Sequence, residues 1–238
     1  MSSLKRFFVM CVTNPLVIEG DEFRHAVSVL RIKEKEQVII CDNSGYEYLA
    51  LVRKIDKKSF SCEILNKTLA ETETKETVTL IAGYLKGDKT EIIVQKAVEL
   101  GVKEIVVFSS DFSSGYVNEN KLARLNRVSI EAAKQCKRTI APPVVYAENF
   151  ESALNYGKDK QNKLFACEFA EKGDCVLNQL TGSTAIVVGS EGGFSNNEFE
   201  LAKEKGYKTV YLGKRILRAE TACIVLTGIV MNALGELK

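Results

Sequence analysis

Two glycine-bearing turns near the C-terminal end carry the residues best suited to bind a ligand. The first turn is Val188-Gly189-Ser190-Glu191-Gly192-Gly193-Phe194, and the second lies within Leu212 to Ala222. Backbone N–H groups at glycine-dense turns that open a helix can bind small ligands, and Glu191 and Glu220 add one carboxylate to each turn. Helix capping by these carboxylates is the common alternative. The two turns therefore predict a ligand site, with the role of its two acids left open.

Each turn is expected to join a strand to a helix. The apolar run Thr184 to Val188 precedes the first turn, and Ser195 with Glu198 three residues later has the pattern of a helix capping box. A short strand, Thr209 to Leu212, leads into the second turn, and a long apolar helix follows from Ala219 to Leu234. Ligands of open α/β sheets bind at such strand ends. We therefore expect both turns at the edge of a sheet.

A polar segment between residues 66 and 77 separates two kinds of pattern. Before it, short runs in which apolar and polar residues alternate predict a small β-barrel, with one helix over Asp21 to Leu30. After it, strand and helix patterns alternate, which predicts an α/β fold with a mostly parallel sheet covered on both faces. The expected strands are Gln37 to Cys41, Glu47 to Lys54, Ser59 to Ile64, Val78 to Tyr84, Glu104 to Phe108 and Leu164 to Cys167, and the other expected helices are Lys89 to Leu100 and Asn118 to Lys137.

The composition argues against several classes of protein. The 238 residues are 45% hydrophobic and carry a formal net charge of +2, so a nucleic-acid partner would have to contact local basic patches. Seven cysteines without a C-x-x-C pair and a single histidine argue against a metal site. Thiols scattered through apolar runs are expected to be buried and reduced. Because no apolar run is long enough to cross a bilayer, we expect a cytoplasmic protein without membrane contact.

Two common nucleotide-binding motifs are not supported. Gly83 to Thr90 approaches a P-loop, but Asp88 separates Gly87 from Lys89 and the spacing between the glycines is one residue short. A carboxylate at that position would repel phosphate. The chain also lacks a G-x-G-x-x-G pattern, so the sequence does not predict a dinucleotide site.

Four polar residues are expected on one stripe of a helix, namely Arg124, Glu131, Gln135 and Arg138. Guanidinium and amide groups bind phosphates and base edges, so the stripe is a candidate contact for nucleic acid. A solvated face with a weak ion pair is the alternative. His25 has no motif around it that would indicate a catalytic triad, and it is either structural or a contact to a phosphate or a stacked base.

Several of these motifs occur together, and in the same order, in a known family. The pattern Gly-x-Glu-Gly-Gly-Phe-Ser from Gly189, with Leu-Gly-x-x-Ile-Leu-Arg-x-Glu-Thr-Ala from Leu212, resembles the bacterial 16S ribosomal RNA (uracil-N3) methyltransferases of the SPOUT superfamily. The resemblance spans nearly the whole chain. It includes His25 with Val29-Leu30-Arg31, Lys86 to Lys89, Gln95 to Gly101, and the stripe from Arg124 to Arg138.

The resemblance implies a PUA-like RNA-binding β-barrel over residues 1–70 and a SPOUT methyltransferase domain over residues 77–238, in which a parallel sheet contains a deep trefoil knot. It also implies a homodimer that binds S-adenosyl-L-methionine in the knotted loops. Glycines let the main chain approach a ligand closely, and neighbouring apolar side chains add surface. The implied cofactor-binding residues are Gly189, Glu191, Gly192, Gly193, Leu212, Gly213, Ile216 and Leu217.

The implied reaction is methyl transfer from S-adenosylmethionine to N3 of a uridine in 16S ribosomal RNA. A cation near the uracil oxygens would stabilise the negative charge that develops when N3 loses its proton. The resemblance makes Arg218 the first candidate for that cation, while Glu220 would orient it or accept the proton. Because the net charge is small, we expect recognition of the assembled small subunit rather than free RNA. The implied RNA contacts are Arg6, His25, Arg31, Lys86, Arg124, Gln135 and Arg138.

Two positions depart from the pattern of the family. Ser190 stands where the family commonly has proline, and Asp111-Phe112-Ser113-Ser114 stands where it has an arginine-serine pair. Without proline, φ is less restricted in the first turn. The missing arginine removes one expected contact to RNA or substrate, and the resemblance assigns no role to Phe112.

Two other functions fit parts of the pattern. A SPOUT enzyme that modifies another RNA base or a ribose hydroxyl would keep the cofactor loops but would differ in the N-terminal domain and the helix stripe. A non-catalytic RNA-binding protein on the same scaffold would not bind S-adenosylmethionine.

Overall fold

A computed structural model of the chain describes residues 4–113, 115–168, 170, 177 and 180–237. The chain divides into two compact units, which we call the N-terminal and C-terminal units. The N-terminal unit comprises Met1–Glu73 and Ala133–Ala141, and the C-terminal unit comprises Thr74–Ala132 and Pro142–Lys238. The first change of unit falls inside the polar segment 66–77. No signal in the sequence pattern indicates the return of residues 133–141 to the N-terminal unit.

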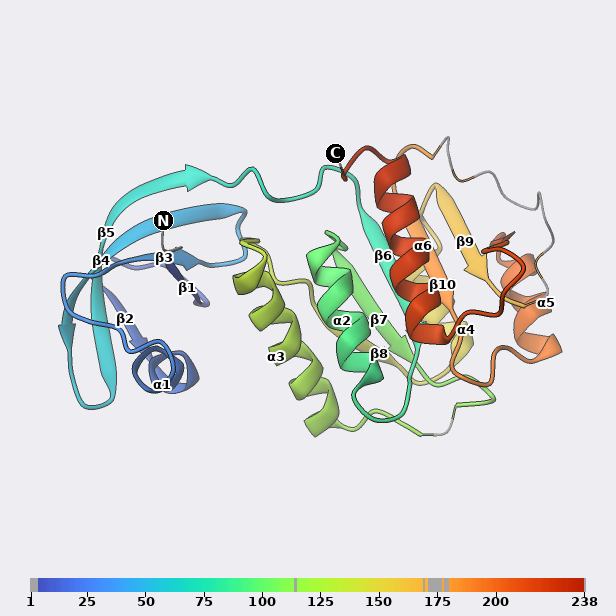
Figure 1. The fold of residues 1–238 in the computed structure, drawn as a ribbon, viewed down its shortest axis with the longest axis horizontal. Coiled ribbons are helices and arrows are strands. Elements are labelled where there is room, and N and C mark those ends of the chain that lie inside the picture. The colour runs from blue at the N-terminus through green and yellow to red at the C-terminus, as the bar shows by residue number, and fades with distance from the viewer. Residues whose placement is uncertain (1–3, 114, 169, 171–176, 178–179, 238) are drawn as a thin grey trace. The chain divides into compact units, whose positions relative to one another are not determined.

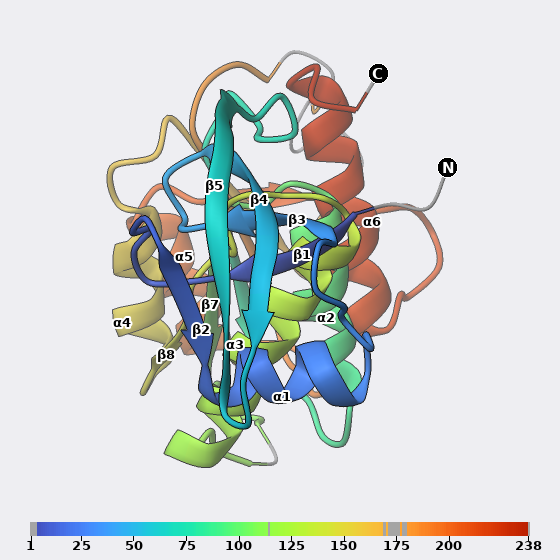
Figure 2. The ribbon, with the colours of Figure 1, turned by 90° about the vertical axis from the view of Figure 1, so that its left-hand side faces the viewer.

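The N-terminal unit is built on a five-stranded sheet with one helix, α1 (Gly20–Ser28) (Figure 2). β1 and β3 pair in parallel, and the other strand pairs are antiparallel. The predicted β-rich unit and its helix are confirmed, and the rings of Phe7 and Phe60 meet in its core with centroids 5.5 Å apart. In spatial order the strands are β1 (Lys5–Phe8), β3 (Gln37–Cys41), β4 (Tyr46–Ile55), β5 (Ser59–Leu69) and β2 (Leu16–Glu19).

The C-terminal unit contains a six-stranded sheet in which every pair of neighbouring strands is parallel (Figure 1). The two middle strands, β6 and β10, are buried along their whole length because helices cover both faces of the sheet. This confirms the predicted parallel α/β sheet. In spatial order the strands are β11 (Lys208–Val210), β9 (Asn162–Ala166), β10 (Thr184–Val188), β6 (Val78–Gly83), β7 (Glu104–Phe108) and β8 (Val144–Ala147).

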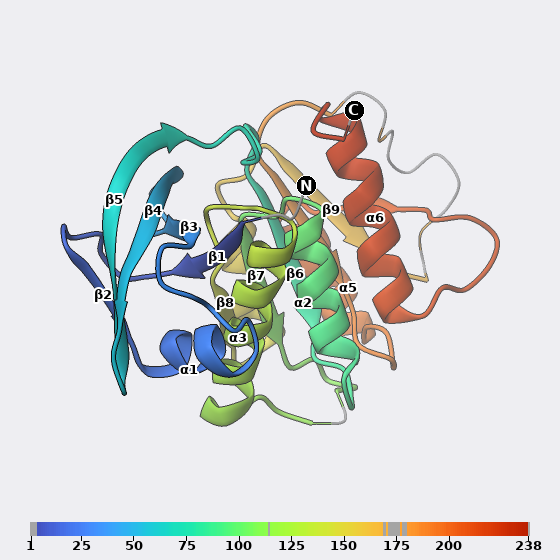
Figure 3. The same ribbon diagram turned by 60° about the vertical axis from the view of Figure 1, so that its left-hand side comes forward.

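Helices form a layer on each side of this sheet. On one side α2 (Lys89–Glu99) packs beside α6 (Ala219–Ala233), as Figures 1 and 3 show, and α6 also contacts β6 and β10. α3 (Glu119–Gln135) begins in the same unit. On the other side, α4 (Phe150–Leu154) contacts β7, β8 and α5 (Asn196–Glu204), and the short 3-10 helix η1 (Asn155–Gly157) follows α4.

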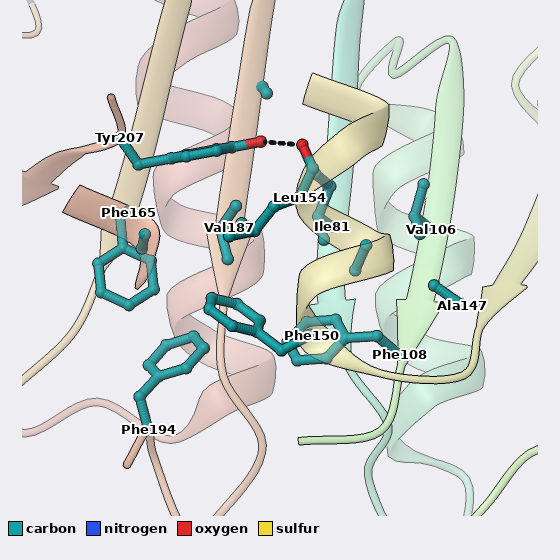
Figure 4. Packing of buried hydrophobic residues seen from close by; sticks show 13 residues of the cluster. Ile81, Val106, Phe108, Ala147, Phe150, Leu154, Phe165, Val187, Phe194 and Tyr207 are labelled. Carbon is teal, nitrogen blue, oxygen red and sulfur yellow. Dashed lines mark hydrogen bonds between the residues drawn. The ribbon is translucent and has the colours of Figure 1, made fainter. Parts of the chain in front are cut away.

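An aromatic cluster fixes the first glycine turn to the core of the C-terminal unit. Phe194, the last residue of that turn, is 3% exposed, and its ring centroid lies 4.4 Å from that of Phe165 on β9. Figure 4 shows Phe194 beside Phe165 and Phe150, with Phe108 on the far side of Phe150. Aromatic pairs at such distances add stabilisation beyond the area that they bury. The turn is therefore held by the same packing that joins α4 to the sheet.

Candidate active site

A cavity of about 840 Å³ lies at the carboxyl ends of three neighbouring strands, β9, β10 and β11. This volume is within the usual range for sites that bind small molecules, and the strand ends are the usual position in an open parallel sheet. Both glycine turns and the start of α6 line the cavity. The cavity brings together all the residues predicted for the cofactor and for catalysis, namely Gly189, Glu191, Gly192, Gly193, Leu212, Gly213, Ile216, Leu217, Arg218 and Glu220.

Hydrogen bonds fix the conformation of the first turn. The Gly193 N–H donates to the Ser190 carbonyl over 3.0 Å, and Gly193 has a φ of +70°. The φ of Gly193 favours glycine, and a Cβ there would lie 2.5 Å from Oε1 of Glu168, so a side chain would displace that carboxylate. The predicted capping box is confirmed, because Ser195 Oγ accepts from the Glu198 N–H and the Glu198 carboxylate accepts from the Ser195 N–H.

The second turn presents an arginine and a carboxylate beside the cavity. Gly213 has a φ of +104°, and Ile216 is 95% exposed, so its apolar surface is available to a ligand. Arg218 is the N-cap residue of α6, and Glu220 lies in the first turn of that helix. Oε2 of Glu220 is buried and has no hydrogen-bond partner among the described residues. A buried acceptor without a partner is costly, and it is a group that a bound ligand can satisfy.

Opposite charges meet at the rim of the cavity. Lys89 Nζ lies 2.9 Å from Oε1 of Glu191. Partial burial opposes the charged form of Glu191, but the hydrogen bond from Lys89 and other favourable contacts outweigh it, so its pKa lies below the ordinary value. The hydrogen bond to Glu191 raises the pKa of Lys89, with a smaller contribution from Glu220. Arg218 opposes this rise in the pKa of Lys89.

Two residues of the cavity were missed by the sequence analysis. Lys89 belongs to the motif that matched the family, although only Lys86 was predicted to act; Lys86 is exposed, and its backbone hydrogen-bonds Glu191. Glu168 follows β9, and its carboxylate packs on Gly193. Ligands bind at the carboxyl ends of parallel strands. Glu168 would have been a candidate if the sequence had shown that β9 lies beside β10.

Two of the predicted RNA contacts are buried in ion pairs within the N-terminal unit. Arg6 is 9% exposed, and its guanidinium lies 2.6 Å from the Glu47 carboxylate. Arg138 is 3% exposed and is held 2.8 Å from Glu73. A paired guanidinium without access to solvent cannot reach a phosphate unless its ion pair breaks. The structure therefore gives no support to the predicted RNA contacts of Arg6 and Arg138.

The other predicted RNA contacts retain access to solvent. Arg31 and Gln135 are exposed, and His25 is half-buried. Arg124 is exposed as well, and its side chain pairs with Glu91 on α2 over 2.8 Å. Because Arg138 is buried, the predicted helix stripe is not one continuous exposed surface.

No group of three His, Cys, Asp or Glu side chains that could hold a metal ion occurs among the described residues. Cys41, Cys62 and Cys223 are buried free thiols, as expected, whereas Cys11 is exposed. Cys175 and Ser114 lie outside the described residues. Within the described parts of the chain, no helix is both long and apolar enough to span a membrane.

Comparison with known proteins relates both parts of the chain to RNA modification. Residues 72–231 match the RNA methyltransferase domain family, and residues 18–65 match the RNA methyltransferase PUA domain family. The ribosomal RNA small subunit methyltransferase E of Buchnera aphidicola (subsp. Acyrthosiphon pisum) is 31% identical over 94% of this chain and 91% of that protein. The protein of the same name from Bacillus subtilis is 32% identical over 86% of this chain and 85% of its own length.

A solved structure has the same fold. A ribosomal RNA small subunit methyltransferase E from Neisseria gonorrhoeae, crystallised with S-adenosyl methionine, aligns with a TM-score of 0.86 and 28% identity. The alignment covers 98% of each chain.

Proposed function

The chain belongs to the family of ribosomal RNA small subunit methyltransferases E, and on this basis we propose that it methylates N3 of a uridine in 16S ribosomal RNA with S-adenosylmethionine as methyl donor. The observation that carries the proposal is the cavity at the ends of β9, β10 and β11, where two glycine turns meet Arg218 and Glu220. A small-molecule site in this cavity agrees with the Neisseria gonorrhoeae structure, which was crystallised with S-adenosyl methionine.

The residues of the cavity fit the chemical groups of S-adenosylmethionine. This cofactor has an adenosine part, an amino acid part and a positively charged sulfonium. Main chain around Gly189, Gly192 and Gly213 would approach its polar edges, while Ile216 and Leu217 would cover apolar surface. The unpartnered Oε2 of Glu220 can accept a hydrogen bond from a donor group in the cavity. When bound, the sulfonium supplies an electrophilic methyl group.

The reaction requires that N3 of uracil lose a proton as it attacks the methyl group. Arg218 is exposed at the start of α6, where its guanidinium can donate to a uracil oxygen and stabilise the developing negative charge. Glu220, two residues further on, would accept the N3 proton or hold Arg218 in place. In a duplex N3 is occupied by base pairing, so the target uridine must be unpaired or flipped out of the helix.

The same proposal covers the oligomeric state, the knot, the domain bounds and the location of the protein. We expect a homodimer, a trefoil knot in the C-terminal unit, and domains over residues 1–70 and 77–238, all of which the resemblance implies. Exposed apolar side chains on α6, Val225 and Ile229, offer surface for a second copy of the chain. Because ribosomal subunits are the substrate, we expect a cytoplasmic location. Sedimentation velocity tests the dimer, and a monomer at assay concentration would contradict it.

Calorimetric titration of the protein with S-adenosylmethionine tests the proposed function. We expect saturable binding at one site per chain, and weaker binding in the variant Gly193→Ala, whose new side chain would enter the space of Glu168. Protein that is folded by circular dichroism but shows no binding heat at several temperatures would support the non-catalytic alternative. A SPOUT enzyme with another target would bind the cofactor but leave the methylation of 16S ribosomal RNA unchanged.

A further inference from the structure

A solvent-exposed phenylalanine stands beside the cavity. Phe112 follows β7 and is 52% exposed. Its side chain packs on Gly192, which lines the cavity, because a Cβ added to Gly192 would lie 2.6 Å from Cβ of Phe112. Phe112 is therefore at the rim of the site in which the proposed cofactor binds.

Hydrogen bonds tie the loop that carries Phe112 to the first glycine turn. Ser110 Oγ lies 3.0 Å from Ser190 Oγ, and both residues are buried. The next residue, Asp111, donates its N–H to the Glu198 carboxylate over 3.0 Å and accepts from Ser195 Oγ over 2.6 Å. Ser190, one departure from the family pattern, thus bonds to Ser110, the residue directly before the other departure.

A further bond within the loop fixes the other side of Phe112. Ser113 Oγ accepts from the Ser110 N–H over 2.8 Å. Both chain neighbours of Phe112, Asp111 and Ser113, are thus held by hydrogen bonds, while Phe112 itself remains half exposed. Such pre-organisation lowers the entropic cost of binding through that side chain.

The surroundings of Phe112 indicate which partner it meets. Its neighbours in the chain, Asp111 and Ser113, are both polar. The same loop exposes Tyr116 (68%), and Lys121 Nζ lies 5.6 Å from the centre of the Tyr116 ring. Exposed aromatic rings with nearby cations are the features by which proteins bind unpaired nucleic acid, through base stacking and contacts to phosphate.

We propose that Phe112 stacks on an unpaired base of the RNA substrate at the rim of the cofactor cavity. The proposal rests on the proposed function. Stacking needs a flat ring, so tryptophan or tyrosine should replace Phe112, whereas leucine should not.

The test compares Phe112→Ala, Phe112→Leu and Phe112→Trp in methylation of small ribosomal subunits purified from a strain that lacks the enzyme. We expect Phe112→Ala and Phe112→Leu to raise KM for the subunits about tenfold, the effect of losing one base–aromatic stack. Phe112→Trp should restore the wild-type KM, and the calorimetric Kd for S-adenosylmethionine should stay within about twofold in all three. Tyr156→Ala, which removes an exposed aromatic side chain on η1, is the control.

Three results would overturn the proposal. They are an unchanged KM in Phe112→Ala, a rescue by leucine equal to that by tryptophan, and a weaker Kd for the cofactor that accounts for the loss of activity. A wild-type protein that binds no S-adenosylmethionine would contradict the proposed function itself, and with it this role of Phe112.

Discussion

Arg218 and Glu220 are the two side chains on which the proposed chemistry depends. They lie two residues apart at the start of α6, and both line the cavity. Positive and negative groups at one rim allow a developing anion to be stabilised and a proton to be accepted at the same place.

Replacing Arg218 by alanine should lower kcat about 100-fold, because one donor to the developing negative charge is lost. Cofactor affinity should change little, since the guanidinium is expected to contact the uracil. Lys203→Ala on α5 removes an exposed cation elsewhere in the same unit and should leave kcat unchanged. If the effect of Arg218→Ala appeared only in the Kd for S-adenosylmethionine, the assigned role would be wrong.

Gly193 provides a second prediction for a single residue. Alanine there must adopt a φ of +70° and displace the Glu168 carboxylate, so the affinity for S-adenosylmethionine should fall about tenfold or more. Gly206→Ala is the matched control, because Gly206 has a φ of +81° but no atom within 4 Å of an added Cβ. Both variants should lower Tm, measured by differential scanning calorimetry. Equal losses of cofactor affinity in the two would show that general strain is responsible.

The residues predicted in the two turns line one cavity, because glycines and charged side chains at strand-to-helix junctions leave a local signal in the sequence. The contact between Ser110 and Ser190 could not be predicted, because these residues are 80 positions apart and meet only when β7 and β10 are placed in the sheet. The burial of Arg6 and Arg138 in ion pairs could not be predicted for the same reason. Their ion-pair partners, Glu47 and Glu73, are distant in the sequence. The sequence alone therefore does not distinguish these paired arginines from arginines exposed to solvent.

At the scale of helices and strands, the prediction succeeded where a pattern was long. β3 and β7 have the predicted bounds, and α2, α3 and α6 differ from the prediction by only one or two residues at an end. The missed elements among the described residues were β1, β2, β8, α4 and η1, each of three to five residues, which is too short for a periodic pattern to develop. β5 continues to Leu69 because pairing with β4 extends it into a polar stretch with no strand pattern.

A buried carboxylate within the N-terminal unit holds the segment that follows α3. Glu73 accepts from the Arg138 guanidinium over 2.8 Å and from the backbone N–H groups of Thr139 and Ile140. Burial alone would raise the pKa of Glu73, but these hydrogen bonds and the charge of Arg138 outweigh it and lower the pKa below its ordinary value of 4.5.

The stabilisation by Glu73 should therefore be complete above about pH 4.5 and should be lost as the pH falls through the lowered pKa. At pH 7, Glu73→Gln should reduce the free energy of unfolding by about 3 kcal/mol, because Arg138 keeps its charge without its partner. The difference from wild type in urea unfolding should shrink in acid. Glu63→Gln breaks the exposed pair with Arg53 and should cost less than about 1 kcal/mol. A pH-independent difference between Glu73→Gln and wild type would contradict the assignment.

At the scale of the whole molecule, the small net charge limits how RNA is bound. A formal charge of +2 on 238 residues provides no broad basic surface, so affinity has to come from local contacts and from the shape of the substrate. The composition made this expectation possible from the sequence alone, whereas the return of residues 133–141 to the N-terminal unit could not be foreseen.

We therefore expect assembled small subunits to be methylated far faster than short naked uridine oligomers. Filter-binding assays with labelled S-adenosylmethionine, at one fixed salt concentration, measure both rates. Equal kcat/KM for the two substrates would show that the shape of the particle contributes nothing to recognition.

Nucleoside analysis of 16S ribosomal RNA tests the central claim most directly. Small subunits from a strain in which the gene has been deleted are incubated with the purified protein and S-adenosylmethionine, then digested to nucleosides and separated by mass spectrometry. The proposed function predicts that N3-methyluridine is absent before the reaction and reaches about one residue per subunit after it, and that Arg218→Ala yields much less in the same time. Another methylated nucleoside, or an unchanged profile, would contradict it.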